Sequence, residues 1–270
     1  MTMHMRFLVA VLVFGTPAIA QLAEYQAEAK MTTDMAQTTL ILRAVRPVPR
    51  GLLRLTEEYG WRLTFEEAPL SYSGDVVDMT SPSYHSKGPD DRALDPRSSV
   101  LTVHFPNPAD PTSLRDEQNT VVDLLKAYAD ADLLGKYRLV VSSDNFLHVI
   151  PVEVRDSKAV LVPVTPLMDQ RVSLPEDNQR TVVQAIQAVL TNISSTVGSK
   201  ILLGGITDNR LNVPFPQKID NMPAREVLDA IFIPLNIKCW TVLYDPGAKL
   251  HVLMIPLPAL EKVVLRKMNE

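Results

Sequence analysis

Four histidines beyond residue 20 could take part in acid–base or metal chemistry: His85, His104, His148 and His251. None has another histidine three or four residues away, the spacing that places two imidazoles on one face of a helix to bind zinc. His148 and His251 occupy matching places in two similar strand patterns, Leu147-His148-Val149 and Leu250-His251-Val252. We expect this pair at a repeated solvent-facing or edge position. The alternative is a shared site in which the two rings meet across a domain interface.

Carboxylates gather at two places in the sequence. Glu66 and Glu67 are neighbours next to a predicted strand, where adjacent side chains point to opposite faces, so we expect two solvated charges rather than a converging pair. The loop-rich segment 67–97 holds a second group: Asp75, Asp78, His85, Asp90, Asp91 and Asp95. Oxygen-rich loops can bind calcium, but the EF-hand spacing is missing and Arg92 and Arg97 intervene. We therefore predict a flexible charged loop.

The sequence contains little evidence for a catalytic nucleophile or a phosphate-binding loop. Cys239, the only cysteine, lies beside Trp240 in an apolar strand pattern, which favours a buried, unreactive thiol and leaves no partner for an internal disulfide. No Gly-x-Ser-x-Gly motif is present, and Gly204-Gly205 lacks the flanking glycines of the nucleotide-binding fingerprints. From these patterns we predict no catalytic, cofactor-binding or metal-binding residue.

Four stretches with helical periodicity, each followed by strand-like runs, must position these residues. The helices are expected at 47–59, 113–134, 179–193 and 222–233. The strands are expected at 61–65, 100–105, 137–141, 146–152, 200–203, 238–244 and 250–255, with a further candidate at 211–215. Gly60 should end the first helix, Asp177 or Asn178 should cap the third, and Asn221 should cap the fourth.

An internal repeat organises these elements. Thr120-Val121-Val122 opens the second helix and Thr181-Val182-Val183 opens the third, while the two Leu-His-Val triplets lie in the hairpins after the second and fourth helices. Each unit reads helix, strand, turn, strand, and such a unit must stack on a neighbour to bury its apolar faces. The pattern predicts an α+β fold: two small domains of helix–strand–strand units, with helices packed on mainly antiparallel sheets.

The N-terminus has the three parts of a secretory signal peptide. Arg6 supplies a positive charge, Phe7 to Phe14 is an unbroken apolar run, and Ala18-Ile19-Ala20 is a small-residue cleavage site. The apolar run is too short to cross a bilayer, which takes about 20 residues. We therefore expect residues 1–20 to be removed during export to the periplasm or the medium, and the remaining chain not to span the membrane.

Composition along the rest of the chain predicts two domains. We expect a flexible lead-in at 21–38, an N-terminal α+β domain at 39–162, a proline-rich linker at 163–178, a C-terminal α+β domain at 179–257 and a tail at 258–270. The formal net charge is −4, no run of lysine and arginine is present, and aromatic residues make up 6% of the chain. These values argue against nucleic acid as a partner.

Three segments follow one another in the order small residue, charged pair, Val-Leu-Asp and strand pair. They are Met222 to Ile231, Trp240 to Tyr244 and Leu250 to Val252. In this order, residues 200–257 resemble the short N-terminal domain of secretins and TonB-dependent receptors, which implies a periplasmic module that contacts other proteins. Around Tyr59-Gly60-Trp61 and Phe65 to Pro69 the chain also resembles uncharacterised exported proteins of environmental bacteria.

Together these observations lead to one functional hypothesis and two alternatives. We expect a non-catalytic protein-interaction module whose partner is another protein of the bacterial envelope. One alternative is an exported hydrolase with its site near the 67–97 loop and His104. The other is a soluble ligand carrier with an apolar cavity between its domains. A deep polar pocket would favour the hydrolase, whereas a shallow surface beside an unpaired strand edge would favour the interaction module.

Overall fold

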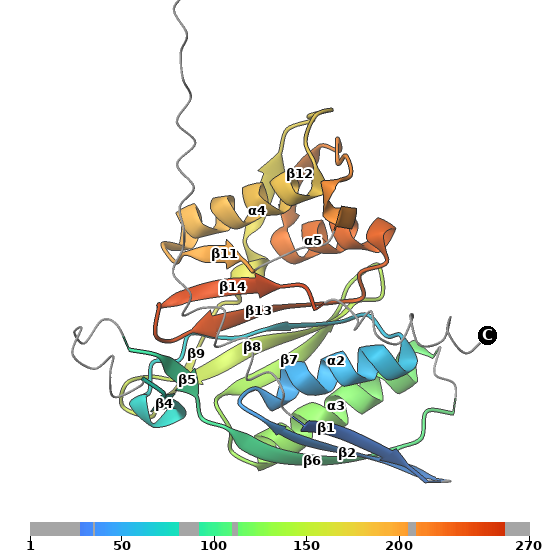
Figure 1. The fold of residues 1–270 in the computed structure, drawn as a ribbon, viewed down its shortest axis with the longest axis vertical. Helices are drawn as coiled ribbons and strands as arrows, with labels where there is room; N and C mark the ends of the chain where they lie inside the picture. Colours follow the sequence, from blue (N-terminus) through green and yellow to red (C-terminus); the bar gives the residue numbers. More distant parts are fainter. Residues whose placement is uncertain (1–27, 35, 81–91, 110–112, 205–208, 257–270) are drawn as a thin grey trace, which may run out of the picture.

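The computed structural model describes residues 28–34, 36–80, 92–109, 113–204 and 209–256, and these form alternating layers of sheet and helix (Figure 1). The predicted α+β fold with mainly antiparallel sheets is confirmed. The predicted signal peptide at 1–20 and the tail at 258–270 lie outside the described residues. No helix in the described ranges is long and apolar enough to cross a membrane.

The middle layer is a seven-stranded sheet in the order β11-β14-β13-β3-β8-β7, with β9 paired to β8. Its strands are β3 (Leu63–Glu66), β7 (Lys136–Val141), β8 (Leu147–Arg155), β9 (Leu161–Pro163), β11 (Ile201–Leu203), β13 (Cys239–Asp245) and β14 (Leu250–Met254). The hairpins β7–β8 and β13–β14 are antiparallel, as the repeat predicts. The short strand β3 lies between β8 and β13 and is parallel to both.

Two helices cover one face of this central sheet and separate it from a second sheet. They are α2 (Pro47–Tyr59) and α3 (Leu114–Asp130), and the second sheet contains β1 (Glu28–Thr33), β2 (Gln37–Ala44) and β6 (Ser99–Pro106) in the order β1-β2-β6. Figure 1 shows this sheet below the two helices. Leu63 and Phe65 of β3 join Leu52 of α2 and Leu124 of α3 in one buried core.

The other face of the central sheet carries α4 (Val182–Val197) and α5 (Ala224–Phe232). A two-stranded sheet of β10 (Arg171–Leu174) and β12 (Ile219–Pro223) packs on the outer side of these helices. Ile186 of α4, Leu228 of α5 and Val242 of β13 belong to a second buried core. A separate ribbon pairs β4 (Val76–Asp78) with β5 (Leu94–Pro96).

Local sequence signals explain how some of the helices begin and end. Gly60 ends α2 with a left-handed φ of 74°, and its N–H donates to the Thr56 carbonyl at 2.8 Å, as predicted. The predicted cap of α4 is wrong, because Thr181 caps it through a capping box with Gln184. Asn221 does not cap α5 either, since β12 runs on to Pro223 at the helix start.

Several strands were not predicted from the sequence, and β1 and β10 are two of them. The segment 21–38, predicted as a flexible lead-in, contains β1 and the start of β2, which pair along their whole length from Glu28 opposite Arg43 to Thr33 opposite Thr38. The predicted linker 163–178 contains β10, which pairs with β12. These strands are stabilised by their neighbours in the sheet, and their own sequences lack a long apolar alternation.

The predicted ranges 39–162 and 179–257 contribute strands to the same central sheet. Leu63 to Glu66 of β3 pair with Cys239 to Val242 of β13, and this parallel pairing crosses the predicted boundary. Each range supplies most of one core, but the sheet between the cores is shared. The residues at this junction therefore decide how the two parts of the chain are held together.

Candidate functional site

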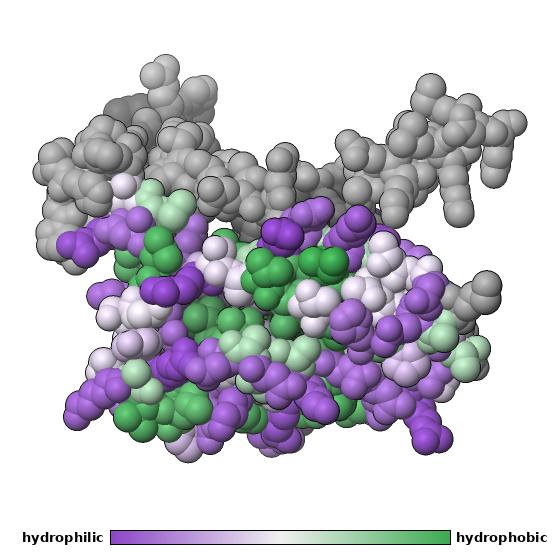
Figure 2. Space-filling view, turned by 90° about the horizontal axis from the view of Figure 1, so that it is seen from below, coloured by the Kyte–Doolittle hydropathy of each residue, from purple (hydrophilic) through white to green (hydrophobic). Residues whose placement is uncertain are grey.

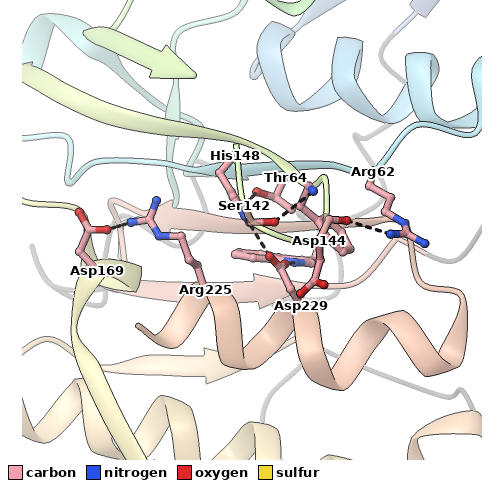
Figure 3. Close-up of polar contacts among 10 residues, drawn as sticks. Arg62, Thr64, Ser142, Asp144, His148, Asp169, Arg225 and Asp229 are labelled. Atoms are coloured by element: carbon pink, nitrogen blue, oxygen red, sulfur yellow. Dashed lines mark hydrogen bonds and ion pairs between the residues drawn. The ribbon is translucent and has the colours of Figure 1, made fainter. Parts of the chain in front are cut away.

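A row of polar side chains lies buried between the central sheet and α5, and we call it the polar row. It consists of Thr64 and Glu66 on β3, His148 on β8, and Arg225 and Asp229 on α5, each 5% exposed or less. Thr64 and His148 are paired neighbours in the sheet. Figure 3 shows the α5 side chains pointing toward the strands. Sequence analysis did not single out Thr64, Arg225 or Asp229.

His148 is at the centre of this row. Its Nδ1 lies 2.7 Å from the Thr64 hydroxyl, and its Nε2 lies 2.9 Å from Oδ2 of Asp229. The second contact is close enough for an ion pair, although its angles fall outside hydrogen-bond geometry. The other carboxylate oxygen of Asp229 accepts a hydrogen bond from the Trp240 indole at 3.3 Å. The contacts of His148 thus join two strands of the sheet to α5.

Other side chains pack around the His148 ring. Phe146 stacks on the ring with a centroid distance of 6.0 Å, and the Arg62 guanidinium lies over Phe146 at 5.7 Å. Arg62 also donates to the Asp144 carbonyl at 2.9 Å, and Ser142 Oγ accepts from the Phe146 N–H at 3.1 Å (Figure 3). The imidazole is therefore packed between its neighbours.

A hydroxyl, an imidazole and a carboxylate in contact are the set used in nucleophilic catalysis. Here Thr64, His148 and Asp229 are at most 2% exposed, and none of them lines the surface grooves around Val100 and around Arg50. A substrate would have to reach the Thr64 oxygen through packed side chains. This geometry supports a structural role, in which a buried polar network holds α5 on the sheet.

Glu66 ties a third element to this junction. Its carboxylate accepts hydrogen bonds from the backbone N–H groups of Leu167 and Met168, the latter at 3.3 Å, at the start of the 3-10 helix η4 (Leu167–Asp169). Burial raises the pKa of Glu66 to about 7, although Arg225 and the two N–H groups favour the ionised form. Arg225 in turn forms an ion pair with Asp169.

Glu67 points away from Glu66, as predicted, but it is not solvated. Its carboxylate forms an ion pair with Arg46 at 2.9 Å and accepts from the Tyr244 N–H at 2.8 Å. Arg46 also donates to the Tyr244 carbonyl at 2.6 Å. Glu66 and Glu67 are both 3% exposed, so the predicted solvation of these two charges is wrong. Each carboxylate accepts hydrogen bonds from residues in distant parts of the sequence.

The prediction that His148 and His251 are solvent-facing is also wrong. His251 is fully buried, and burial lowers its pKa to about 4. Its Nδ1 lies 3.3 Å from Ser199 Oγ, and its ring contacts the ring of Tyr244 at a centroid distance of 4.9 Å. Neither Ser199 nor Tyr244 is among the residues that contact His148, so these contacts do not join the two histidines in one site.

The 67–97 loop and His104 do not form one cluster in the part of the chain that is described. Asp75 is buried and forms an ion pair with Arg155 at 3.0 Å. His104 is exposed on β6, where its Nδ1 lies 3.0 Å from the Thr39 hydroxyl. Asp78 pairs with Leu94, and Asp95 pairs with Val77, across the two strands of the β4–β5 ribbon. His85, Asp90 and Asp91 lie outside the described residues.

Metal ligands and a reactive thiol were not predicted. Within the described ranges, no group of three or more histidine, cysteine, aspartate or glutamate side chains is placed to hold a metal ion. Cys239 is buried, as predicted, and burial raises its pKa to about 12. The thiol is therefore protonated at neutral pH, and a protonated thiol is a poor nucleophile.

A groove on the surface gathers apolar side chains, and we call it the Val100 groove. Its volume is about 540 Å³, and it is lined by Arg43, Ala44, Val45, Val77, Met79, Asp95, Pro96, Ser98, Ser99 and Val100. Val77, Met79 and Val100 are 39%, 50% and 58% exposed. Figure 2 views the molecule from the side of the β1-β2-β6 sheet and shows apolar side chains gathered among polar ones.

Comparison with known proteins adds no relative to this description. No protein-family model matches the chain. No match was found among the curated proteins or among the solved structures.

Proposed function

We propose that this chain is an exported, non-catalytic protein-interaction module of the bacterial envelope, and that it binds a partner protein at the Val100 groove. Export is proposed from the signal-peptide pattern of residues 1–20. The resemblance of residues 200–257 to a periplasmic interaction domain agrees with this proposal. The observation that carries it is the exposed apolar lining of the groove.

The groove is suited to a protein partner for physical reasons. Three large apolar side chains, Val77, Met79 and Val100, are each more than a third exposed and line the same groove. Contiguous exposed apolar surface bordered by polar groups is typical of protein-interaction sites, because its burial releases ordered water. Arg43 and Asp95 border the groove with opposite charges, which can orient a partner.

The buried polar groups support the same interpretation. Thr64, His148 and Asp229 contact one another away from the surface, each at most 2% exposed. These contacts join the central sheet to α5, on the face of the sheet opposite to the β1-β2-β6 sheet. A fixed scaffold that presents a surface groove needs little reordering when it binds.

Val100→Asp tests the proposal directly. The tagged full chain would be expressed in its native envelope, crosslinked, purified and analysed by mass spectrometry. We expect a reproducible partner that is lost with Val100→Asp, because a carboxylate in the groove must be desolvated on binding. Val160→Asp is the matched control, since Val160 is 55% exposed and lies outside the groove.

The two variants separate the possible outcomes. Loss of the partner with Val100→Asp and its retention with Val160→Asp would support the groove as the binding surface. Equal recovery with both variants, or no partner with the unchanged chain, would overturn the proposal.

A further inference from the structure

The strand β1 offers an open edge on the side of the molecule that faces away from β2. It is the end strand of the order β1-β2-β6, and all six of its residues pair with β2. No strand in the described part of the chain pairs with its other edge. Backbone N–H and C=O groups on such an edge can pair with an extended segment of another protein.

A second groove runs between this edge and α2, and we call it the β1 groove. Its volume is about 420 Å³. Ala29 to Met31 form its strand side, and Arg50, Leu53, Arg54 and Glu57 form its helix side. Met31 and Leu53 are half-buried, so a strand added to β1 would cover apolar surface there.

Positive charge predominates in the lining of the β1 groove. Lys30, Arg50 and Arg54 line it together with one carboxylate, that of Glu57. Arg54 is already paired, with Glu57 at 3.5 Å and with Glu58 at 2.7 Å. Lys30 and Arg50 form no ion pair with other described residues, which leaves two cations available to a ligand.

Arg50 has a guanidinium N–H that no described residue accepts. Its Nε is buried and has no hydrogen-bond acceptor among the described residues. Arg50 lines the groove beside β1, so a carboxylate that enters the groove would meet a cation that forms no ion pair with other described residues.

We propose that the β1 groove binds an extended acidic segment of a partner protein, which adds to β1 as a further strand. Alternate side chains of an added strand point to one face. On the α2 side, an added strand would place a carboxylate near Arg50 and an apolar side chain near Leu53. Lys30 alternates with Ala29 and Met31, which pack against the core, so a carboxylate on the opposite face would lie near Lys30. This surface shares no lining residue with the Val100 groove, so the two proposals stand or fall separately.

Fluorescence anisotropy with labelled peptides tests the proposal on the purified full chain. The probe is the extended peptide Glu-Glu-Leu-Glu-Glu-Glu, which carries glutamates on both faces of a strand and one leucine on the face that would lie toward α2. Its first control replaces glutamate with lysine, and its second carries N-methyl groups on alternate amides, which removes strand hydrogen bonds without changing the charge. We expect binding of the first peptide alone, because both the charge and the strand edge are required.

Variants of the chain locate the binding surface. Lys30→Glu and Arg50→Gln should each weaken binding by about tenfold. Lys158→Glu makes the same charge change on an exposed lysine in the β8–β9 turn and should leave the affinity unchanged. Val100→Asp should also leave it unchanged, which separates this result from the test of the Val100 groove.

Three results would overturn the proposal. The first is no binding of the acidic peptide to the unchanged chain. The second is equal binding of the N-methylated peptide, which would mean charge attraction without strand addition. The third is equal loss of affinity in Lys30→Glu and Lys158→Glu, which would mean that only the total charge of the protein matters.

Discussion

Burial has opposite consequences for the ionisation of two residues near the centre of the molecule. Glu66 and His251 are both cut off from solvent. Burial disfavours the charged form of each, which raises the pKa of the carboxyl to about 7 and lowers the pKa of the imidazole to about 4. The sequence shows two ordinary polar residues, and their properties come from what covers them.

These shifts predict how stability depends on pH. Glu66 ionises near pH 4.5 in the unfolded chain and near pH 7 in the folded chain. Between these values the folded chain keeps a proton that the unfolded chain releases. The stability that Glu66 contributes is therefore present below pH 4.5 and is lost as the pH rises to about 7. The total effect is on the order of 3 kcal/mol.

Glu66→Gln should remove this dependence. Well above pH 7 the variant should have a higher free energy of unfolding than the unchanged chain, because a neutral amide replaces a buried carboxylate, and the two should converge near pH 4.5. Urea unfolding followed by circular dichroism over a pH series measures the difference. Glu58→Gln, at an exposed position on α2, is the control and should parallel the unchanged chain.

His251 changes the free energy of unfolding in the opposite direction over part of the same pH range. Its contribution is present above pH 6.5 and is lost as the pH falls toward 4, because only the unfolded imidazole takes up a proton there. The two groups therefore oppose each other in the unchanged chain. In Glu66→Gln the free energy of unfolding should therefore fall more steeply as the pH is lowered from 6.5 to 4. Parallel pH profiles for Glu66→Gln and the unchanged chain would contradict this account.

At the scale of elements, the polar row depends on a match between a strand and a helix. Thr64 and Glu66 are two residues apart on β3, which spans about 7 Å. Arg225 and Asp229 are four residues apart on α5, which spans about 6 Å. The similar spacings let Asp229 reach His148 beside Thr64 while Arg225 lies near Glu66. Helix and strand are thus held in one register along their length.

Asp229→Asn tests this contact between α5 and the sheet. It keeps the size of the side chain but removes one acceptor from the buried contacts with His148 and Trp240, so we expect a loss of about 2 kcal/mol in the free energy of unfolding. Asp220→Asn is the control, because Asp220 is exposed on β12 and pairs with Lys218 at the surface. Its cost should stay below about 1 kcal/mol. Equal costs for the two variants would show that His148 does not depend on Asp229.

At the scale of the whole molecule, one sheet separates two cores and belongs to both. Trp61 is buried in the core beside α2, and Trp240 is buried in the core beside α5. They are the two tryptophans of the chain, so each reports on one core. The pairing of β3 with β13 and the contacts of His148 join the cores.

We therefore predict that both cores unfold together. Trp61→Phe leaves only the signal of Trp240, and Trp240→Phe leaves only the signal of Trp61. Urea transitions of the two variants, followed by fluorescence and by circular dichroism, should coincide within each variant. A fluorescence change that precedes the circular dichroism change in one variant would show instead that its core unfolds as an independent domain.

Local sequence patterns were sufficient to predict most of the long helices and strands. Apolar residues at helical spacing predicted α2 with the bounds that the structure has. Gly60 predicted its end, because the left-handed backbone conformation there favours glycine. The repeated hairpins β7–β8 and β13–β14 and the α+β fold class were also predictable from local patterns. Local periodicity suffices where an element buries one continuous face.

How those elements pack against one another depends on long-range contacts that no local pattern predicts. The short strands β1 and β10 gain their order from the strands beside them, which no local pattern encodes. The parallel pairing of β3 with β13 and the contact of His148 with Asp229 join residues far apart in the chain. Whether Glu66, Glu67 and His148 are solvated or buried follows from these long-range contacts, because burial is a property of the packed molecule and not of the residue.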